Sequence, residues 1–357
     1  MQNLVDHFIQ HIHSAASTRS AVLIQGGNSK HFYGNATNPA EIDVLNVTPY
    51  SGVVDYDPSE LIITVKAGTR LAELESLLLQ SNQMLAFEPP HFTENATLGG
   101  TIAAGLSGPR RAYRGSVSDF VLGIRLLDGQ GHDLRFGGRT MKNVAGYDVS
   151  RLMVGSLGTL GVILEASLKV LPRPEVELSI CLAMNQSQAI EKIHQWTSKP
   201  LPISASCYHE NKLFIRLSGS QAGTRAAYQK IGGEILESSD LFWQSLRDHT
   251  HSFFASGKRL WRLSVKSTLP SIALEGEQLI EWGGALRWLA TDGHENDQTL
   301  RQHISDLHGH ATLFYGNKTN IQAFHPLSPS MLKIHQRLKQ RFDPLGIFNH
   351  GRIYSDF

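Results

Sequence analysis

The chain has 357 residues, of which 41% are hydrophobic and 18% are charged. Single hydrophobic cores stop growing at about 250–300 residues, so this length predicts two domains with separate cores. The charges almost cancel, to a net +1, and leave no broad electrostatic field for binding nucleic acid or an anionic membrane. A role in binding nucleic acid is therefore not expected.

Targeting and membrane segments are not expected either. The first twenty residues mix polar side chains with isolated apolar ones, and no apolar run approaches the roughly 20 residues that a membrane-spanning helix needs. We expect a cytoplasmic protein with at most peripheral membrane contact. Cys181 and Cys207 are too few for a thiolate iron–sulfur or zinc site, and they predict two free thiols.

The first half of the chain predicts an α+β fold with many short strands. Leucines at positions 71, 74, 77 and 78 share one face and predict a helix over Arg70–Gln83. Pro172 and Pro174 then interrupt both kinds of element, which places a domain boundary there. Buried strands are predicted over Ala21–Gln25, Leu61–Ala67, Val121–Leu127 and Val162–Leu171.

The second half alternates strands and helices. The short gap at Glu210-Asn211 favours an antiparallel sheet with helices on one face. Trp261 alternates with Leu263 and Val265, which predicts a core position for the indole. Strands are predicted over Leu178–Leu182, Leu213–Leu217, Leu260–Val265, Ala285–Ala290 and Ala311–Phe314. Helices are predicted over Ser187–Thr197, Gln221–Ile231, Leu274–Trp282 and Pro329–Phe342.

The first of three glycine-rich segments is LIQGGNSK, residues 23–30. A buried strand runs into two glycines, whose amides can turn inward as a nest for an anion. Asn28 and Ser29 add neutral donors, and Lys30 adds a cation. This pattern suits a pyrophosphate, although a strand followed by an ordinary glycine turn has the same local appearance.

The second segment, Phe87–Arg111, has almost no bulky side chains over residues 97–108. Leu98, Ile102 and Leu106 recur at four-residue spacing, which predicts a short helix packed on one side and bare on the other. A bare surface of this kind is typical of close approach to a ligand.

The third segment spans Lys142–Leu171 and carries Gly155, Gly158 and Gly161 just before an apolar strand. The strand follows the glycines, whereas in the dinucleotide-binding fingerprint it precedes them, so NAD is disfavoured as the cofactor. No Walker A sequence occurs, which also disfavours a nucleoside triphosphate.

These three segments, in this order and at these separations, resemble the FAD-binding domain of the vanillyl-alcohol oxidase and p-cresol methylhydroxylase (PCMH-type) superfamily. Within it, the stretches EPPHFTENATLGGTIAAGLSGPRRAYRGSVSDFVLGIRLLDG and FGGRTMKNVAGYDVSRLMVGSLGTLGVILEASLKVLPRP are most similar to FAD-binding subunits of glycolate oxidases. The resemblance covers residues 20–174 and the tail RFDPLGIFNHGRIY. The region 175–330 is similar only in length and strand order.

The resemblance implies a two-lobed FAD-binding domain over 1–173, an antiparallel α+β cap domain over 174–328, and a C-terminal helix and tail over 329–357 that return to the flavin. The residues it assigns to FAD binding are Gly26, Gly27, Asn28, Ser29, Lys30, Pro90, Thr97, Leu98, Gly99, Gly100, Ala103, Ala104, Gly105, Ser156, Gly158, Thr159, Gly161, Val162 and Asn349. Relatives with covalent flavin often have histidine where Asn28 stands, so non-covalent FAD is implied. His31 is interpreted as a surface-loop residue, and His350 replaces a proline common in the tail.

Oxidation of a 2-hydroxy acid needs a cation for the carboxylate and a base for the hydroxyl proton. The candidate catalytic residues are Arg110, Arg111, Arg114 and Tyr147. Alternatives for the arginines are a solvated run or a run that neutralises the FAD phosphates. The polar cluster of Lys142, Asn143, Tyr147 and Asp148 suits either a surface facing the flavin or a loop held by its own hydrogen bonds. Catalytic relatives carry His-x-Gly-Asp-Gly-Asn in the second domain. This chain lacks it, so no metal site is expected.

The resemblance therefore implies one FAD-binding subunit of a hetero-oligomer that oxidises glycolate to glyoxylate. A sister flavoprotein would carry the catalytic motif, and an iron–sulfur subunit would lead electrons onward. Two alternatives remain open at this point: an autonomous FAD-dependent D-lactate or 2-hydroxyacid dehydrogenase, and a non-catalytic assembly subunit.

Overall fold

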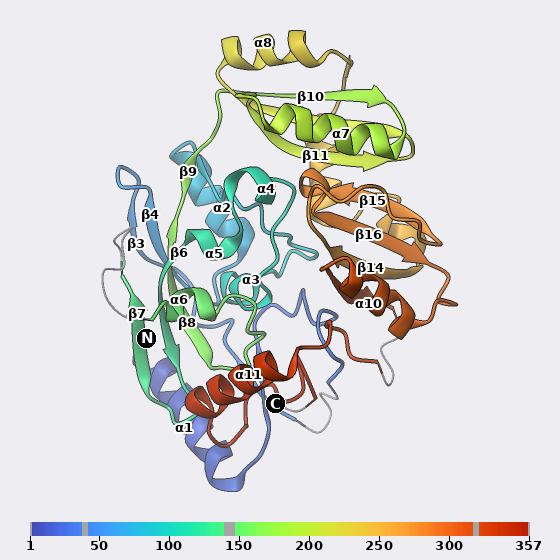
Figure 1. Cartoon of the computed structure of the whole chain (residues 1–357). Helices are drawn as coiled ribbons and strands as arrows, with labels where there is room; N and C mark the ends of the chain where they lie inside the picture. Colours follow the sequence, from blue (N-terminus) through green and yellow to red (C-terminus); the bar gives the residue numbers. More distant parts are fainter. Residues whose placement is uncertain (1, 38–41, 139–146, 317–320, 356–357) are drawn as a thin grey trace.

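The computed structural model describes residues 2–37, 42–138, 147–316 and 321–355. Within these ranges, antiparallel sheets of five and eight strands occupy different parts of the molecule, and helices pack on both (Figure 1). The chain leaves the first sheet at Lys169 and enters the second at Val176, so Pro172 and Pro174 fall between them. The predicted mixture of helices with antiparallel strands is present.

The five-stranded sheet holds the core of the N-terminal part. Leu74 of helix α2 and Ile102 of α3 pack with Leu126 of β6 and Leu168 of β8 in one buried cluster. In spatial order the strands are β3 (Val53–Asp57), β4 (Ile62–Lys66), β8 (Val162–Lys169), β6 (Val121–Leu127) and β7 (Asp133–Gly137). The helices are α2 (Leu71–Gln80), α3 (Leu98–Ala104), α4 (Arg111–Arg114), α5 (Val117–Phe120) and α6 (Val149–Leu152).

The N-terminal segment and the C-terminal tail lie side by side. Helix α1 (Gln2–Thr18) leads into β1 (Val22–Gln25), which pairs in parallel with β2 (Asp43–Asn46). The Val22 amide donates to the Ile347 carbonyl at 2.8 Å, and the Asn349 amide donates back to Val22 at 3.0 Å. The tail therefore adds a bridge beside β1. A further short pair is formed by β5 (Gln83–Met84) and β9 (Leu171–Pro172).

Helix α11 (Pro329–Phe342) precedes this tail (Figure 1). Its buried Lys339 side chain anchors the tail. The Lys339 ammonium donates to Asp343 at 2.7 Å and to the carbonyls of Thr159 and Phe348 at 2.8 and 2.7 Å. Asp343 in turn accepts from the amides of Ile347 and Phe348. The bounds of α11 agree with the prediction, because Pro329 suits the first turn of a helix and Pro344 cannot continue it.

The eight-stranded sheet is antiparallel throughout, as predicted. In spatial order its strands are β13 (Glu234–Ile235), β10 (Val176–Ala183), β12 (Lys212–Gly219), β11 (Ile203–His209), β15 (Glu277–Glu281), β16 (Leu286–Thr291), β14 (Arg259–Ser264) and β17 (His310–Tyr315). Its helices are α7 (Gln186–Thr197), α8 (Gln221–Ile231), α9 (Ser239–Arg247) and α10 (Asp297–Asp306). The 3-10 turns are η2 (Phe254–Ser256) and η3 (Trp282–Gly284).

Helices cover both faces of this sheet, which corrects the expectation of helices on one face. Leu289 of β16 packs with Leu300 and Ile304 of α10. The neighbouring Trp288 points to the opposite face, where it shares a cluster with Trp243 and Leu246 of α9. That second face is the one that meets the N-terminal part.

The helix predicted over Leu274–Trp282 is wrong, because residues Glu277–Glu281 form strand β15. Leu279 and Ile280 are adjacent in sequence but are buried in the cores on opposite faces of the sheet, which requires a two-residue period. Hydrogen bonding to β11 on one side and β16 on the other outweighs the local leucine spacing. Trp261 is fully buried, as predicted.

A buried ion-pair network joins the two parts of the molecule. The Arg110 guanidinium bonds Glu88 at 2.8 Å and reaches Glu177 of β10, while Arg216 of β12 bonds Glu88 at 2.9 Å. Burial alone would raise the pKa of Glu88, but the guanidinium groups of Arg216 and Arg110 hold it below its usual value. The segment that follows Phe87 is thereby fixed against the eight-stranded sheet.

Candidate functional site

The cavity lined by most of the predicted cofactor residues, which we call the principal cavity, forms where four distant segments meet. Its empty space, including the part open to solvent, is about 820 Å³. Its walls are the loop after β1, one side of α3, residues 157–163 at the start of β8, and the C-terminal tail. The lining residues are Leu23, Ile24, Gln25, Gly26, Gly27, Asn28, Ser29, Lys30, His31, Val47, Thr97, Gly99, Gly100, Ala103, Ala104, Leu157, Gly158, Gly161, Ile163, Asn349 and Arg352.

The loop after β1 presents a row of free backbone donors. Within the described ranges, the amides of residues 27–30 donate to no protein acceptor. Asn28 has φ +58°, which turns the chain. A methyl group on Gly27 would stand 1.5 Å from the Asn95 carbonyl oxygen, so the close approach of these two segments requires glycine. Successive amides in such a turn form an anion-binding concavity.

A buried ammonium group completes this loop. Lys30 is 8% exposed, and its Nζ has a hydroxyl of Ser29 at 3.3 Å and the Phe92 ring at 5.5 Å. Burial lowers the pKa of Lys30 to about 7, although the Asp248 carboxylate acts in the opposite direction. No ion pair to Lys30 is formed within the described residues, and an anionic group in the cavity would supply one.

Helix α3 forms a wall with little side-chain bulk. Thr97 caps its N-terminus and accepts from the Gly100 amide at 3.4 Å. Gly99, Gly100 and Ala103 line the cavity, and Gly99 also packs closely against Ala67. Leu98 and Ile102 face the opposite way into the core. The predicted arrangement, packed on one side and bare on the other, is the one observed.

The tail closes the cavity from the opposite side. The Asn349 side chain accepts from the Ile24 amide at 2.7 Å and donates to the Leu157 carbonyl at 2.6 Å, so it joins β1 to the glycine segment. Gly158 has φ +74°, and a methyl group there would lie 2.6 Å from the Asn349 amide nitrogen. Arg352 donates to the carbonyls of His31, Tyr33 and Asn35 and holds the loop after β1 in place.

Thirteen of the nineteen residues predicted to hold a cofactor line this cavity, and six do not. Pro90 lies in a different pocket, described below. Leu98 and Val162 are core residues, and Gly105 ends α3 in a left-handed conformation. Ser156 and Thr159 are buried behind the wall, where the Thr159 hydroxyl donates to the Ser156 carbonyl at 2.8 Å.

Eight lining residues were not predicted: Leu23, Ile24, Gln25, His31, Val47, Leu157, Ile163 and Arg352. The interpretation of His31 as a surface-loop residue is corrected, because the side chain is part of the cavity wall. Its pKa is lowered by burial and by the charge of Arg352. Apolar strand residues of this kind leave no compositional signal, since any core strand has the same appearance.

A second, smaller cavity of about 330 Å³ lies between the segment that follows α3 and the eight-stranded sheet. We call it the inter-sheet pocket. Its lining residues are Pro90, Phe92, Leu106, Ser107, Gly108, Pro109, Leu246, Arg247, His249, Arg262, Glu281, Trp282, Leu286, Trp288 and Phe314. Phe92 is close to both cavities, because its ring also lies beside the Lys30 ammonium.

The four candidate catalytic residues are spread apart in the structure. Arg110 is 3% exposed and engaged by Glu88 and Glu177, so its charge serves the buried network. Arg111 lies over the Trp282 ring at 4.4 Å, at the edge of the inter-sheet pocket. Arg114 is exposed, and Tyr147 is 94% exposed in another region, near α6. Lys142 and Asn143 lie outside the described residues.

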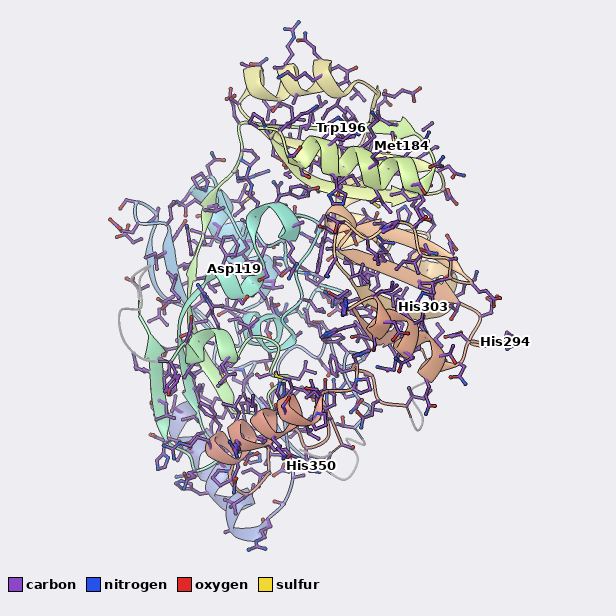
Figure 2. All side chains as sticks on the ribbon, in the orientation of Figure 1. Asp119, Met184, Trp196, His294, His303 and His350 are labelled. Carbon is purple, nitrogen blue, oxygen red and sulfur yellow. The ribbon has the colours of Figure 1, made fainter. Side chains whose placement is uncertain are left out.

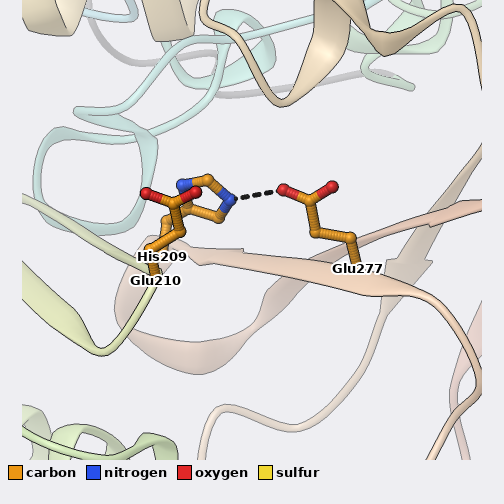
Figure 3. Close-up of side chains that lie close together, drawn as sticks. All are labelled: His209, Glu210 and Glu277. Carbon is orange, nitrogen blue, oxygen red and sulfur yellow. Dashed lines mark hydrogen bonds and ion pairs between the residues drawn. The ribbon is translucent and has the colours of Figure 1, made fainter.

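The histidines do not gather into one site. His294, His303 and His350 are exposed on separate elements (Figure 2). Among the residues that the structure describes, one group could hold a metal ion: His209 at the end of β11, Glu210 in the following turn and Glu277 of β15 offer ligand atoms within 4.8 Å of one another (Figure 3). His209 and Glu277 already pair at 2.8 Å. The sequence led to no expectation of a metal site, and Glu277 lies far from the other two residues along the chain.

Known proteins share this fold and sequence. Residues 5–137 match the FAD binding domain family. The glycolate oxidase subunit GlcE of Escherichia coli (strain K12) is 47% identical over 98% of this chain and 97% of its own length. The glycolate oxidase subunit GlcD of Bacillus subtilis (strain 168) is 31% identical over 48% of this chain and 36% of its own length. The structure of an alkyldihydroxyacetonephosphate synthase, 15% identical, has a TM-score of 0.65 and covers 95% of this chain and 74% of that one.

The matched domain and the relatives define an FAD-binding oxidoreductase, and the cofactor is FAD. The α+β fold class and the cofactor predicted from sequence are thus confirmed. The chain belongs to the family of the glycolate oxidase subunit GlcE. Among the helices that the structure describes, none combines the length and apolar character needed to cross a bilayer.

Proposed function

We propose that this chain is the FAD-binding subunit of a complex that oxidises glycolate, a 2-hydroxy acid, to glyoxylate. The observation that carries the proposal is the cavity of four meeting segments in a chain that is 47% identical, over nearly its whole length, to a glycolate oxidase subunit. FAD, when bound, accepts the two electrons and the hydrogen that leave the hydroxy acid carbon. The residues that hold it are the thirteen predicted ones that line the cavity, together with Arg352 and His31.

The donor set of the cavity suits the pyrophosphate of FAD. Four free amides and one buried ammonium, at residues 27–30, converge on a single loop. Phosphate oxygens accept from such donors, and charge-assisted bonds are about twice as strong as neutral ones. Asn28, whose amide has no nucleophilic nitrogen, supports non-covalent binding. The part played by the tail is to hold the two glycine segments together through Asn349.

The proposed division of the chain follows from the two sheets. Residues 1–173 form the FAD-binding domain, 174–328 form the cap domain, and 329–357 form the helix and tail that return to the first domain. The partners we propose are a sister flavoprotein subunit and an iron–sulfur subunit, which take the electrons onward and bring the complex to the membrane surface. The E. coli relative is itself named as a subunit of an oxidase, which supports assembly of this kind.

The test is an anaerobic visible spectrum of the purified chain, before and after glycolate and then dithionite. We expect a yellow protein, from which denaturation releases all the flavin. Bleaching by glycolate would show that this chain accepts electrons from the substrate itself, and bleaching by dithionite alone would assign the first step to the sister subunit. A protein that stays colourless even with added FAD would contradict the proposal.

Replacing Lys30 with glutamine is expected to weaken FAD binding about 10- to 100-fold, because one charge-assisted bond to phosphate is lost. The wild-type affinity is also expected to depend on pH. Burial lowers the pKa of Lys30 to about 7, and a bound phosphate favours the charged ammonium. Binding therefore takes up a proton above pH 7, and the affinity falls by up to about tenfold per pH unit there.

The measurement is the dissociation constant of FAD from pH 6 to 9, followed by quenching of flavin fluorescence. The Lys30→Gln variant should lose this slope, while His31→Gln, a neighbour in the same wall, should keep it. An equal slope in wild type and Lys30→Gln would show that another group takes up the proton.

A further inference from the structure

We propose that the inter-sheet pocket of this chain binds a small carboxylate, whose anionic group is held by Arg262 and whose adjacent hydroxyl is bonded by His249. The inference rests on the proposed function and deepens it, because a 2-hydroxy acid carries these two groups on neighbouring carbons. It assigns a substrate-binding role to this chain and not to its partner subunits alone.

Arg262 forms no ion pair within the described part of the chain, although its charge acts on the nearby Glu281 carboxyl. It projects from β14, in the middle of three paired strands, and its guanidinium lies 5.1 Å from the Trp282 ring. No hydrogen bond or ion pair to this guanidinium is formed by any residue in the described part of the chain. Arg259, three residues earlier on the same strand, bonds both Glu295 and Asp297. A half-buried arginine normally has such partners, so the free fork of Arg262 is available to a ligand.

A second unpaired guanidinium increases the positive charge at this place. Arg111 lies 4.4 Å from the same Trp282 ring and also has no ion pair among the described residues. Its pKa is lowered first by burial and then by the charge of Arg262. Arg111 is exposed and lies at the edge of the pocket, so solvent screens its charge and it adds only weakly to the attraction of an anion.

His249 supplies an unused hydrogen-bonding atom in the same pocket. Its Nδ1 is buried and has no partner. The ring is stacked on Phe254 at 4.0 Å and stands edge-on to Trp288 at 4.9 Å, so its orientation is fixed by aromatic contacts. Burial, with a contribution from Arg262, lowers the pKa of His249 to about 3. The imidazole is therefore neutral at physiological pH and can accept or donate one hydrogen bond to a hydroxyl.

Glu281, the acidic residue of this pocket, does not cancel the positive charge. Its carboxylate accepts from the Trp288 indole at 2.9 Å and forms no ion pair with Arg262. Burial raises the pKa of Glu281 to about 7, while the Trp288 hydrogen bond and the charge of Arg262 act in the opposite direction. Burial therefore favours the neutral carboxyl, which does not compete with a bound anion for Arg262.

The pocket is smaller than the principal cavity, with an empty space of about 330 Å³ against about 820 Å³, and aromatic rings form much of its wall. It is too small for a nucleotide, so only a ligand of few atoms reaches Arg262 and His249. Phe92 lies in its wall and also 5.5 Å from Lys30 of the FAD cavity, so a molecule bound here is adjacent to the cofactor site.

The test uses the FAD-loaded chain under anaerobic conditions, with glycolate as the probe and ethylene glycol, which lacks the carboxylate, as the reference. Binding is followed by tryptophan fluorescence, since Trp282 and Trp288 line the pocket, and by the shift in melting temperature. We expect glycolate alone to quench the fluorescence and raise Tm. Arg262→Gln should weaken glycolate binding about 10- to 100-fold.

The variant's own stability separates binding from a structural role. Arg262 has no salt bridge to lose and is repelled by Arg111, so Arg262→Gln should melt at the wild-type temperature or above it. Arg262→Lys, which keeps the charge but lacks the planar fork, should bind glycolate with intermediate affinity. Arg225→Gln, an exposed arginine on α8, is the matched control and should bind as wild type does.

Glycolate binding of equal affinity in wild type and Arg262→Gln would overturn the inference, and so would a wild-type chain that responds equally to glycolate and ethylene glycol. A drop in Tm for Arg262→Gln with glycolate binding retained would mark the arginine as structural and also overturn it. These outcomes leave the proposed function intact if the chain is yellow and still supports glycolate oxidation in the whole complex. A colourless chain would contradict the proposed function itself.

Discussion

Replacing Gly27 with alanine is expected to produce a chain that no longer retains FAD. The added methyl group would lie 1.5 Å from the Asn95 carbonyl oxygen, far inside van der Waals contact, and both atoms belong to backbone-bound positions that cannot rotate away. The loop after β1 must therefore move away from the segment that precedes α3. That movement separates the amides of residues 27–30 from the opposite wall of the cavity. Overpacking of this kind typically costs about 1–3 kcal/mol of folding stability as well.

The measurement is the flavin content of the purified protein, from its visible absorbance, together with its melting temperature. Gly257→Ala is the matched control. Gly257 has φ +67°, and a methyl group there meets nothing within 4 Å, so the variant should lose about 1–2 kcal/mol and keep its flavin. A fully yellow Gly27→Ala protein would show that the two segments can separate without opening the cavity.

Replacing Glu88 with alanine is expected to lower the free energy of unfolding by about 3–5 kcal/mol, the usual loss when one partner of a buried ion pair is removed. The change leaves Arg110, which is 3% exposed, and Arg216, which is 5% exposed, with fewer counter-charges. Both guanidiniums would then be poorly solvated in the contact between the two sheets. Urea unfolding followed by circular dichroism measures the loss. Glu73→Ala, an exposed glutamate on α2, should change the free energy by less than about 0.5 kcal/mol.

The same residue predicts an acid limit to stability. The folded-state pKa of Glu88 is held below its unfolded value of about 4.5 by the two arginines. A group with a depressed pKa stabilises the fold above the unfolded pKa, and this contribution is lost as the pH falls through the folded pKa. Stability of the wild type should therefore fall below pH 4.5 more steeply than that of Glu88→Gln. If stability falls equally steeply below pH 4.5 in wild type and Glu88→Gln, the buried ion-pair network is not the cause of the acid limit.

Elements with local signals were predictable from sequence alone. Helices Gln221–Ile231 and Pro329–Phe342 and strand Val121–Leu127 have the predicted bounds, because a glycine, a proline or an Asp-Gly turn stands at their ends. Helix α1 was not predicted, although Val5, Phe8, Ile12 and Ala15 are all buried on one face. Its apolar spacing is helical, but the many polar residues between these positions dilute the signal.

Strand β15 shows the limit of local pattern. Leu279 and Ile280 are buried in two different cores, on opposite faces of the sheet. Their local sequence does not predict this, because the two faces exist only once β11 and β16 have paired with β15. The same holds for strand β11, which was not predicted. Sheet propensity depends on the neighbours that a strand meets, and these lie far away in the sequence.

The principal cavity was largely predictable because its walls are built mostly from backbone. A turn that brings backbone amides together requires glycine, and a helix face without large side chains requires glycine and alanine. Residues 26–30 and 97–105 are rich in these two residue types, so the sequence reveals both features. The inter-sheet pocket was not predictable. Arg262 and His249 differ from any other arginine or histidine only in lacking partners, which is a property of the folded chain.

The bridge between Val22 and Phe348 imposes an order on events during protein synthesis. Lys30 leaves the ribosome early, whereas Asn349 and Arg352, which complete the wall around it, are translated more than 300 residues later. Domains generally fold from the N-terminus as they emerge. Until the tail has been synthesised, the nascent chain has a cavity that lacks one wall and cannot enclose FAD. We therefore expect FAD to bind late, after the tail has emerged from the ribosome.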